Sequence, residues 1–113
     1  MFTLYGIKNC DTVKKARKWL DGNAIAYQFH DFRSDGLDIE LLTRLEAKLG
    51  WENMLNRRST SWRKLDDQQK DDLSLDKAIA LMLETPTLIK RPVLDTGEQI
   101  LIGFNQDDYQ KLQ

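Results

Sequence analysis

The chain has 113 residues, which is enough for one domain with a hydrophobic core of its own. A formal net charge of −1 excludes a bulk electrostatic attraction to nucleic acid or to an anionic membrane. No apolar run approaches the roughly 18 residues of a membrane span, and the N-terminus lacks the pattern of a signal peptide. Cys10 is the only cysteine, so no disulfide can form within the chain, and we expect a protein of the reducing cytoplasm.

The first third of the chain predicts a strand, a helix and a second strand. Residues 2–5 are a short apolar run, and residues 25–32 alternate apolar with polar side chains, as a half-buried strand does. Between them, residues 11–23 predict a helix, because apolar side chains recur at i, i+3 and i+7, namely at Val13, Ala16 and Leu20.

The middle of the chain predicts helices. Residues 37–49 carry leucines four apart and predict one helix, whereas residues 51–65 are less regular and predict short helical turns. Residues 66–72 are charged and predict a solvated surface. Residues 74–84 predict another amphipathic helix, whose buried side we expect to consist of Leu75, Ile79, Met82 and Leu83.

The C-terminal third predicts a β-hairpin and a closing helix. Apolar runs at 93–94 and 100–102 flank Asp95-Thr96-Gly97-Glu98, which is a tight-turn sequence. Asn105 can cap a last helix that extends to about Leu112. The initial strand–helix–strand unit predicts a parallel pair and the hairpin adds antiparallel strands, so we expect an α/β protein with a mixed sheet flanked by helices.

Cys10 falls where the first strand has ended and the first helix begins. The free N–H groups of a helix N-terminus and the positive end of its dipole stabilise an anion, and Lys8 adds positive charge nearby, whereas Asp11 opposes it. A lone cysteine can equally be an inert packing residue. Its position at the start of a helix favours a reactive thiolate, to which Thr12 could donate a hydrogen bond if it does not cap the helix instead.

The residue three positions after Cys10 decides the kind of thiol chemistry. Val13 stands where a Cys-x-x-Cys motif has its second thiol, and the chain offers no other cysteine. A dithiol mechanism within one chain is therefore excluded. Any redox cycle needs an external thiol, and glutathione is the obvious one.

Four segments in order along nearly the whole chain resemble the arsenate reductase-like (ArsC) family, which includes glutathione-using arsenate reductases, the Spx regulators and the YffB proteins, and the resemblance is closest to the YffB branch. The segments are Gly6-Ile7-Lys8-Asn9-Cys10-Asp11-Thr12, Phe29-His30-Asp31-Phe32-Arg33, Asn56-Arg57-Arg58 and Ile89-Lys90-Arg91-Pro92-Val93. The resemblance implies one thioredoxin-like domain over residues 1–113, with a four-stranded mixed sheet and a helical insertion at about residues 37–84.

The same resemblance implies roles for particular residues. Cys10 would be the catalytic thiol, assisted by Arg91, and Pro92 would be a cis proline close to the cysteine in space. From the residues alone, an ordinary trans proline is strongly favoured at position 92, and only the family resemblance implies the cis form. The substrate or glutathione site would comprise Lys8, Asn9, Thr12, Arg57, Arg58 and Pro92.

Arginine suits carboxylate recognition, because its fork donates two parallel hydrogen bonds. Lys8, Arg91 and one of Arg57 or Arg58 would bind the carboxylates of glutathione, and both members of the arginine pair stay candidates. His30, the only histidine, is expected to be a structural, hydrogen-bonded residue rather than a catalytic base.

The chain departs from the family at one point that bears on substrate. Arsenate reductases carry a third arginine shortly before the last helix, where this chain has Gly103-Phe104-Asn105. Each charge-assisted hydrogen bond contributes roughly 1.5–3 kcal/mol, so the loss argues against arsenate as the physiological substrate.

The leading hypothesis is a cytoplasmic, monomeric thiol oxidoreductase that uses glutathione as co-substrate, through a mixed disulfide on Cys10, to reduce a small-molecule or protein disulfide. It would bind no cofactor, metal, nucleic acid or membrane. The first alternative is an arsenate reductase. The second, from another class, is a non-catalytic regulator of the Spx kind that binds RNA polymerase, although Val13 removes the usual Spx redox switch.

Overall fold

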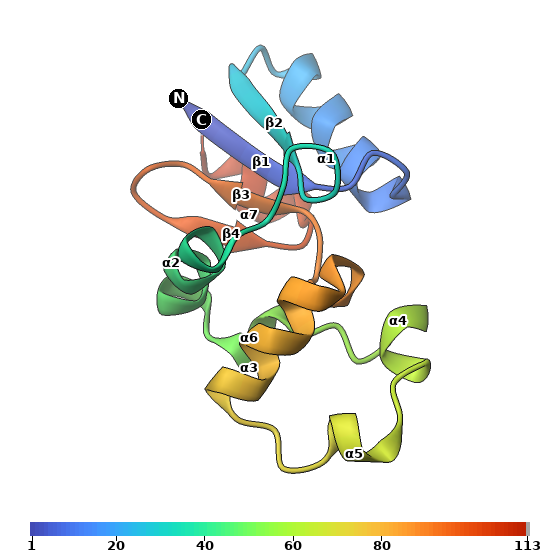
Figure 1. Cartoon of the computed structure of the whole chain (residues 1–113). Coiled ribbons are helices and arrows are strands. Elements are labelled where there is room, and N and C mark those ends of the chain that lie inside the picture. The colour runs from blue at the N-terminus through green and yellow to red at the C-terminus, as the bar shows by residue number, and fades with distance from the viewer. Residues whose placement is uncertain (113) are drawn as a thin grey trace. The chain divides into compact units, whose positions relative to one another are not determined.

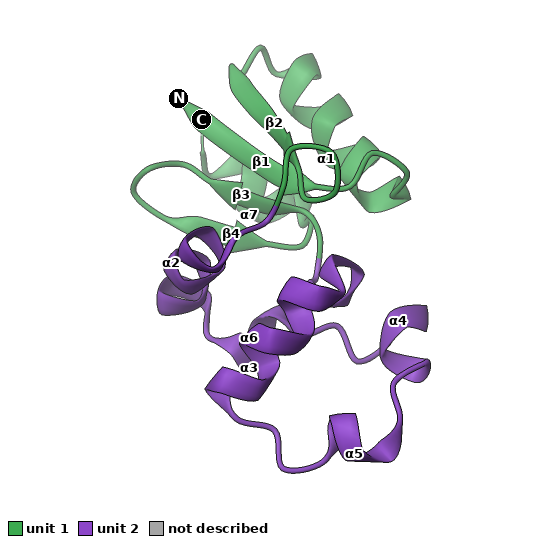
Figure 2. Ribbon diagram, in the orientation of Figure 1, with its two compact units in different colours: residues 1–36, 91–113 green, residues 37–90 purple. Residues whose placement is uncertain are grey.

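The computed structural model describes residues 1–112, which fall into two compact units (Figure 2). The first comprises residues 1–36 together with the C-terminal segment from residue 91, and the second comprises residues 37–90. The second unit begins at residue 37, where the helical insertion was expected to begin. It extends beyond the expected end at residue 84 to Lys90, because it includes the turn Pro86–Leu88. Within residues 1–112, no helix is long and apolar enough to cross a membrane.

The first unit is built on a mixed four-stranded sheet in the order β2-β1-β3-β4, which confirms the predicted fold class (Figure 1). The pair β1–β2 is parallel, whereas β1–β3 and β3–β4 are antiparallel. The second strand is shorter than expected and begins at Tyr27. The strands are β1 (Phe2–Gly6), β2 (Tyr27–Asp31), β3 (Val93–Asp95) and β4 (Ile100–Ile102).

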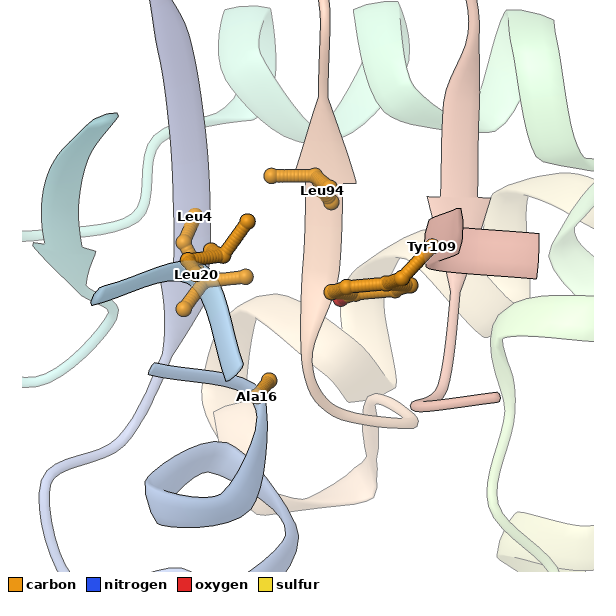
Figure 3. Packing of buried hydrophobic residues seen from close by; sticks show 5 residues of the cluster. All are labelled: Leu4, Ala16, Leu20, Leu94 and Tyr109. Atoms are coloured by element: carbon orange, nitrogen blue, oxygen red, sulfur yellow. The ribbon is translucent and has the colours of Figure 1, made fainter. Parts of the chain in front are cut away.

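Two helices, α1 (Asp11–Gly22) and α7 (Gln106–Gln110), bury side chains against one face of this sheet (Figure 3). Leu4 of β1 and Leu94 of β3 are register partners, so their side chains point to the same face. There they form a fully buried cluster with Ala16, Leu20 and Tyr109. Burial of a leucine side chain contributes roughly 1.5–3 kcal/mol, so this cluster stabilises the packing of α1 on the sheet.

The second unit is helical, as the sequence predicted for most of this stretch. Side chains of Asp38, Ser59, Asp66 and Ser74 cap four of its helices by accepting a hydrogen bond from a backbone N–H in the first turn. Its elements are α2 (Ile39–Leu49), α3 (Trp51–Met54), α4 (Thr60–Arg63), α5 (Asp67–Lys70), α6 (Leu75–Glu84) and a 3₁₀ turn (Pro86–Leu88).

The predicted buried side of α6 was wrong at Leu75, and Ile79 and Leu83 are half-buried rather than fully buried. Met82 is buried as expected, but its buried companions are Ala78 and Leu81, and Leu75 is 45% exposed. Ser74 is the N-cap, which makes Leu75 the first helical residue, and the buried stripe runs from the second turn onward. Four-residue spacing also misplaced the start of α2, which begins at Ile39.

Candidate functional site

Four chain segments meet at the end of the sheet where β1 stops. Gly6, the last residue of β1, pairs with Asp31, the last residue of β2. The antiparallel register of β1 and β3, continued by one residue, sets Pro92 opposite Gly6. On the far side of Pro92, its carbonyl accepts a hydrogen bond of 2.8 Å from the backbone N–H of Gly103. The loop that carries Cys10 leaves the sheet from the middle of this row.

Cys10 is the N-cap residue of α1, as the sequence predicted. Its backbone is extended, with φ −119° and ψ 122°, and its carbonyl accepts the first helical hydrogen bond, at 3.0 Å from the N–H of Lys14. The thiol is free and half-buried, and the side chain makes no capping hydrogen bond. The sulfur therefore stays available for chemistry at the positive end of a twelve-residue helix.

Close packing between Gly6 and Val13 fixes where α1 begins. A Cβ atom on Gly6 would lie 2.8 Å from Cγ2 of Val13, which is closer than real Cβ contacts allow. Val13 is fully buried. The position that holds the second thiol in a Cys-x-x-Cys motif thus carries a packing residue here, and the missing side chain of Gly6 lets the first turn of α1 approach the end of β1.

The Asp31 carboxylate ties the Cys10 loop to the end of β2, and sequence reasoning gave it no role in the site. Oδ2 accepts a hydrogen bond of 3.0 Å from the backbone N–H of Lys8, two residues before Cys10. Oδ1 accepts from the N–H groups of Arg33, at 2.7 Å, and Ser34, at 3.2 Å. Asp31 is only 3% exposed, so these N–H groups take the place of water around a buried charge.

The same contacts set the ionisation of Asp31. Burial removes water from the carboxyl group and acts to raise its pKa, but hydrogen bonds from the backbone N–H groups of Arg33, Ser34 and Lys8, together with the Lys8 ammonium, outweigh it. The pKa of Asp31 is therefore held below its ordinary value. The only sequence signal for this residue is its place within the segment that resembles the ArsC family.

The bond between Arg91 and Pro92 is cis, which confirms what the family resemblance implied. Pro92 is buried and Arg91 is half-buried. Both residues belong to the first unit, at the end of the sheet from which the Cys10 loop leaves.

The other predicted site residues divide between the two units. Lys8, Asn9 and Thr12 are exposed in the loop and the first turn around Cys10. Arg57 and Arg58 belong to the second unit, so their predicted place in the site stays a prediction. Their local surroundings differ. The Arg57 guanidinium lies 5.7 Å from the centre of the Trp62 ring, whereas the backbone N–H of Arg58 donates to the Asn56 side chain.

Each residue of the segment 103–105, where arsenate reductases carry a third arginine, has a structural role in this chain. Gly103 has a positive φ of 76°, a conformation that disfavours other residues. The Phe104 ring packs edge-on against Tyr109 at 4.9 Å, and the Asn105 side chain accepts hydrogen bonds from the first turn of α7. This stretch therefore contributes no cation to the end of the sheet.

His30 is a structural residue, as predicted. Its Nε2 donates to the carbonyl oxygen of Gly36 at 2.7 Å, and its ring packs against Tyr5 at 5.1 Å. Within residues 1–112, no group of three or more histidine, cysteine or acidic side chains is placed to hold a metal ion.

Residues 5–112 match the ArsC family. The chain belongs to the ArsC family. Its structure is similar to that of the YffB (PA3664) protein, with 53% identity, coverage of 98% of this chain and 97% of that one, and a TM-score of 0.94. It also resembles an arsenate reductase (ArsC) related protein from Brucella melitensis, with 44% identity, coverage of 97% and 92%, and a TM-score of 0.81.

Curated relatives extend the comparison to proteins of different description. An uncharacterized protein of Haemophilus influenzae is 52% identical over 110 residues, which are 97% of this chain and 96% of that protein. The global transcriptional regulator Spx of Streptococcus mutans is 31% identical over 110 residues, which are 96% of this chain and 80% of the regulator. Family membership therefore includes both arsenate reductase-like proteins and regulators, and the choice between them rests on the site.

Proposed function

We propose that this protein is a glutathione-dependent thiol oxidoreductase that acts through Cys10 alone. The observation that carries the proposal is the position of this cysteine, which caps α1 at the same end of the sheet as Arg91 and the cis Pro92. A thiol with no capping bond at a helix N-terminus is free to act as the nucleophile of a thiol–disulfide exchange. Val13, buried at the third position after it, leaves the second thiol to come from solution.

The reaction consists of two thiol–disulfide exchanges. The Cys10 thiolate attacks the glutathione sulfur of a glutathione mixed disulfide, a new S–S bond forms between Cys10 and glutathione, and the substrate leaves as a thiolate. A free glutathione thiolate then attacks the glutathione sulfur of this adduct, which releases oxidised glutathione and restores the Cys10 thiolate. Overall, one glutathione thiol and the mixed disulfide become the substrate thiol and oxidised glutathione. The substrate thiolate takes up the proton that glutathione lost, so the steps need no other oxidant or reductant.

Charged side chains around Cys10 would hold glutathione through its two carboxylates. Lys8 is exposed in the Cys10 loop, and Arg91 is half-buried beside Pro92. We propose that these two residues bind the carboxylates. The family resemblance implies the same role for one of Arg57 or Arg58, which belong to the second unit. Asn9, Thr12 and the backbone at Pro92 would contact the peptide part, since a peptide offers amide groups that pair with such donors and acceptors.

Arsenate reduction with the same thiol is the second candidate, and the relation to an arsenate reductase related protein of Brucella melitensis favours it. The segment 103–105 speaks against it, because a turn glycine, a packed ring and a helix cap stand where a third arginine would clamp the oxyanion. A direct assay with arsenate and glutathione decides between them. Turnover of arsenate comparable with that of a disulfide would overturn the preference for disulfides.

The relation to Spx of Streptococcus mutans favours a third candidate, a non-catalytic regulator that binds RNA polymerase. Binding of the purified protein to bacterial RNA polymerase, together with a Cys10 that forms no glutathione adduct, would support the regulator and overturn the enzyme. We place the enzyme in the cytoplasm, because a glutathione cycle needs a reducing compartment. We also propose that it acts as a monomer.

The deciding experiment treats the protein with oxidised glutathione, follows it by intact-protein mass spectrometry, and then measures turnover of a glutathione mixed disulfide with glutathione. We expect one glutathione adduct on the wild type, its removal by reduced glutathione, and loss of both adduct and turnover in Cys10→Ser. The matched control is Ser34→Ala, which changes an exposed hydroxyl and keeps the backbone N–H that Asp31 accepts. Turnover that survives Cys10→Ser would refute the proposal.

A further inference from the structure

The structure assigns to Asp31 the role of a positioning residue, which holds the Cys10 loop in its reactive geometry through the backbone of Lys8. This inference rests on the proposed function only in taking Cys10 as the reacting thiol. Asp31 is itself 3% exposed, so its carboxylate lies behind the loop and acts through the hydrogen bond it accepts.

The two oxygens of the Asp31 carboxylate bind two different segments of the chain. Oδ2 accepts from the Lys8 N–H at 3.0 Å, while Oδ1 accepts from the N–H groups of Arg33 and Ser34. One oxygen therefore serves the Cys10 loop and the other serves the loop after β2. A carboxylate offers acceptors on both oxygens, whereas a carboxamide offers them on one only.

Hydrogen bonds to its backbone fix the position of Asp31 itself. Its backbone N–H donates to the Asp35 side chain at 2.8 Å, and its carbonyl accepts from the Asp35 N–H at 2.8 Å. The next residue, Phe32, donates from its N–H to the carbonyl of Gly6 at 2.9 Å. These hydrogen bonds fix the backbone that carries the carboxylate. The loop from Ile7 to Cys10 is held at two points, by the hydrogen bond at the Gly6 carbonyl and by the hydrogen bond from the Lys8 N–H to Asp31.

The loop that Asp31 holds carries the thiol. Cys10 follows Lys8 by two residues and begins α1, so a displaced Lys8 would shift the thiol relative to the helix N–H groups that stabilise its anion. A misplacement of about 1 Å in a reacting group can lower a rate by up to about 100-fold. The carboxylate charge itself does not favour a thiolate nearby, so the benefit of Asp31 to the thiol must come from geometry.

The test measures the reaction of Cys10 with a small aromatic disulfide, 4,4′-dithiodipyridine, across a range of pH. This reagent needs no glutathione site, so the result is independent of whether the protein uses glutathione. The rate constant on the high-pH plateau, where the thiol is fully ionised, removes the effect of a changed thiolate fraction. We expect Asp31→Asn to lower this plateau by about tenfold, since the amide cannot accept from both sides.

Two further variants separate geometry from charge. Asp31→Glu keeps the charge but moves the oxygens, and we expect a comparable loss. Asp21→Asn is the matched control, since it makes the same change of charge at an exposed residue in the last turn of α1. Its plateau should stay within about twofold of the wild type.

Each outcome decides the matter. Equal plateaus for Asp31→Asn and the wild type, or a full recovery in Asp31→Glu, would overturn the positioning role. Unfolding of both Asp31 variants at 10 °C, judged by circular dichroism, would make Asp31 a determinant of folding and would also overturn it. A wild type that reacts rapidly with the aromatic disulfide but forms no glutathione adduct would refute the proposed function. The role of Asp31 would then still be decided by the plateau rate constants of its variants.

Discussion

The carboxylate of Asp31 and the backbone N–H of Lys8 lie 3.0 Å apart, and this hydrogen bond joins the end of β2 to the loop that carries Cys10. It links residues that are 23 positions apart in the chain. Since parallel β1 and β2 both end at this edge of the sheet, the topology brings the buried carboxylate and the reactive loop together.

The first prediction concerns stability against acid. The pKa of Asp31 is lowered in the folded protein, so the unfolded chain binds this proton more tightly, and acid favours unfolding. The stabilising contribution is complete above the ordinary value of 3.8 and is lost as the pH falls through the lower folded pKa. Asp31→Asn removes it, so urea unfolding should show a flatter dependence on pH below about 4.

At neutral pH the same substitution leaves the N–H groups on one side of the new carboxamide without an acceptor, which makes Asp31→Asn less stable by about 1–3 kcal/mol. Asp21→Asn, with the same change in charge at an exposed residue, should differ from the wild type by less than about 1 kcal/mol. Equal slopes against pH for the wild type and Asp31→Asn would contradict the assignment.

The second prediction concerns the contact between Gly6 and α1. Gly6→Ala places a methyl group 2.8 Å from Cγ2 of Val13 and forces the first turn of the helix away from β1. We expect a loss of about 1–3 kcal/mol in the free energy of unfolding, measured in urea. In a double-mutant cycle, Gly6→Ala should cost less in a Val13→Ala background than in the wild type, because the two methyl carbons that clash are then absent. An equal cost in both backgrounds would mean that the contact does not limit the position of α1.

The elements around Cys10 could be predicted from local sequence, because each carries its own signal. The apolar run of β1, the spacing of Val13, Ala16 and Leu20, and the turn residues of the hairpin all act over short distances along the chain. The N-cap position of Cys10 followed from the junction of two such elements. The cis bond before Pro92 could be expected only from the family resemblance.

The contribution of Asp31 could not be predicted in the same way. Its partners are backbone N–H groups, which every residue except proline carries, so no pattern of side chains marks them. The prediction of the buried side of α6 failed for a related reason. The choice between Leu75 and Leu81 as a buried residue depends on the neighbours that pack against the helix, and the periodicity of one helix does not contain them.

The third prediction concerns an unpaired polar atom in the core. The Tyr109 hydroxyl is buried with no hydrogen-bond partner among residues 1–112, and burial raises the pKa of Tyr109. Tyr109→Phe keeps the ring and its packing against Trp19 and Phe104 and removes the unpaired group. We expect it to be more stable than the wild type by about 1 kcal/mol, measured by urea unfolding.

Tyr27→Phe is the control for this change, because the Tyr27 hydroxyl accepts a hydrogen bond of 3.2 Å from Nε of Arg17. Its removal should leave stability unchanged or lower it by up to about 1.5 kcal/mol. A loss of stability in Tyr109→Phe as large as in Tyr27→Phe would show that the buried hydroxyl has a partner in solution, such as an ordered water molecule.

The last prediction concerns how the site binds glutathione. Arg91→Ala removes the fork next to Pro92, and charge-assisted hydrogen bonds contribute about 1.5–3 kcal/mol each, so KM for glutathione should rise by about 10- to 100-fold. We expect a smaller change in kcat, because the reacting sulfur atoms lie on Cys10 and on glutathione, and a binding contact kept throughout the reaction affects mainly KM. The KM of Arg91→Lys for glutathione should fall between those of the wild type and Arg91→Ala, since lysine keeps the charge but not the paired donors.

The neighbouring Lys90 supplies the matched control. Its side chain is exposed, and the interaction that its backbone makes, an N–H donating to the carbonyl of Met54 at 2.7 Å, persists in Lys90→Ala. This variant makes the same change in net charge one residue away, so general attraction of the anionic substrate changes equally in both proteins. A rise in KM confined to Arg91→Ala places the carboxylate of glutathione on that guanidinium. Equal rises in both variants would reduce the role of Arg91 to a general attraction and would remove it from the binding site.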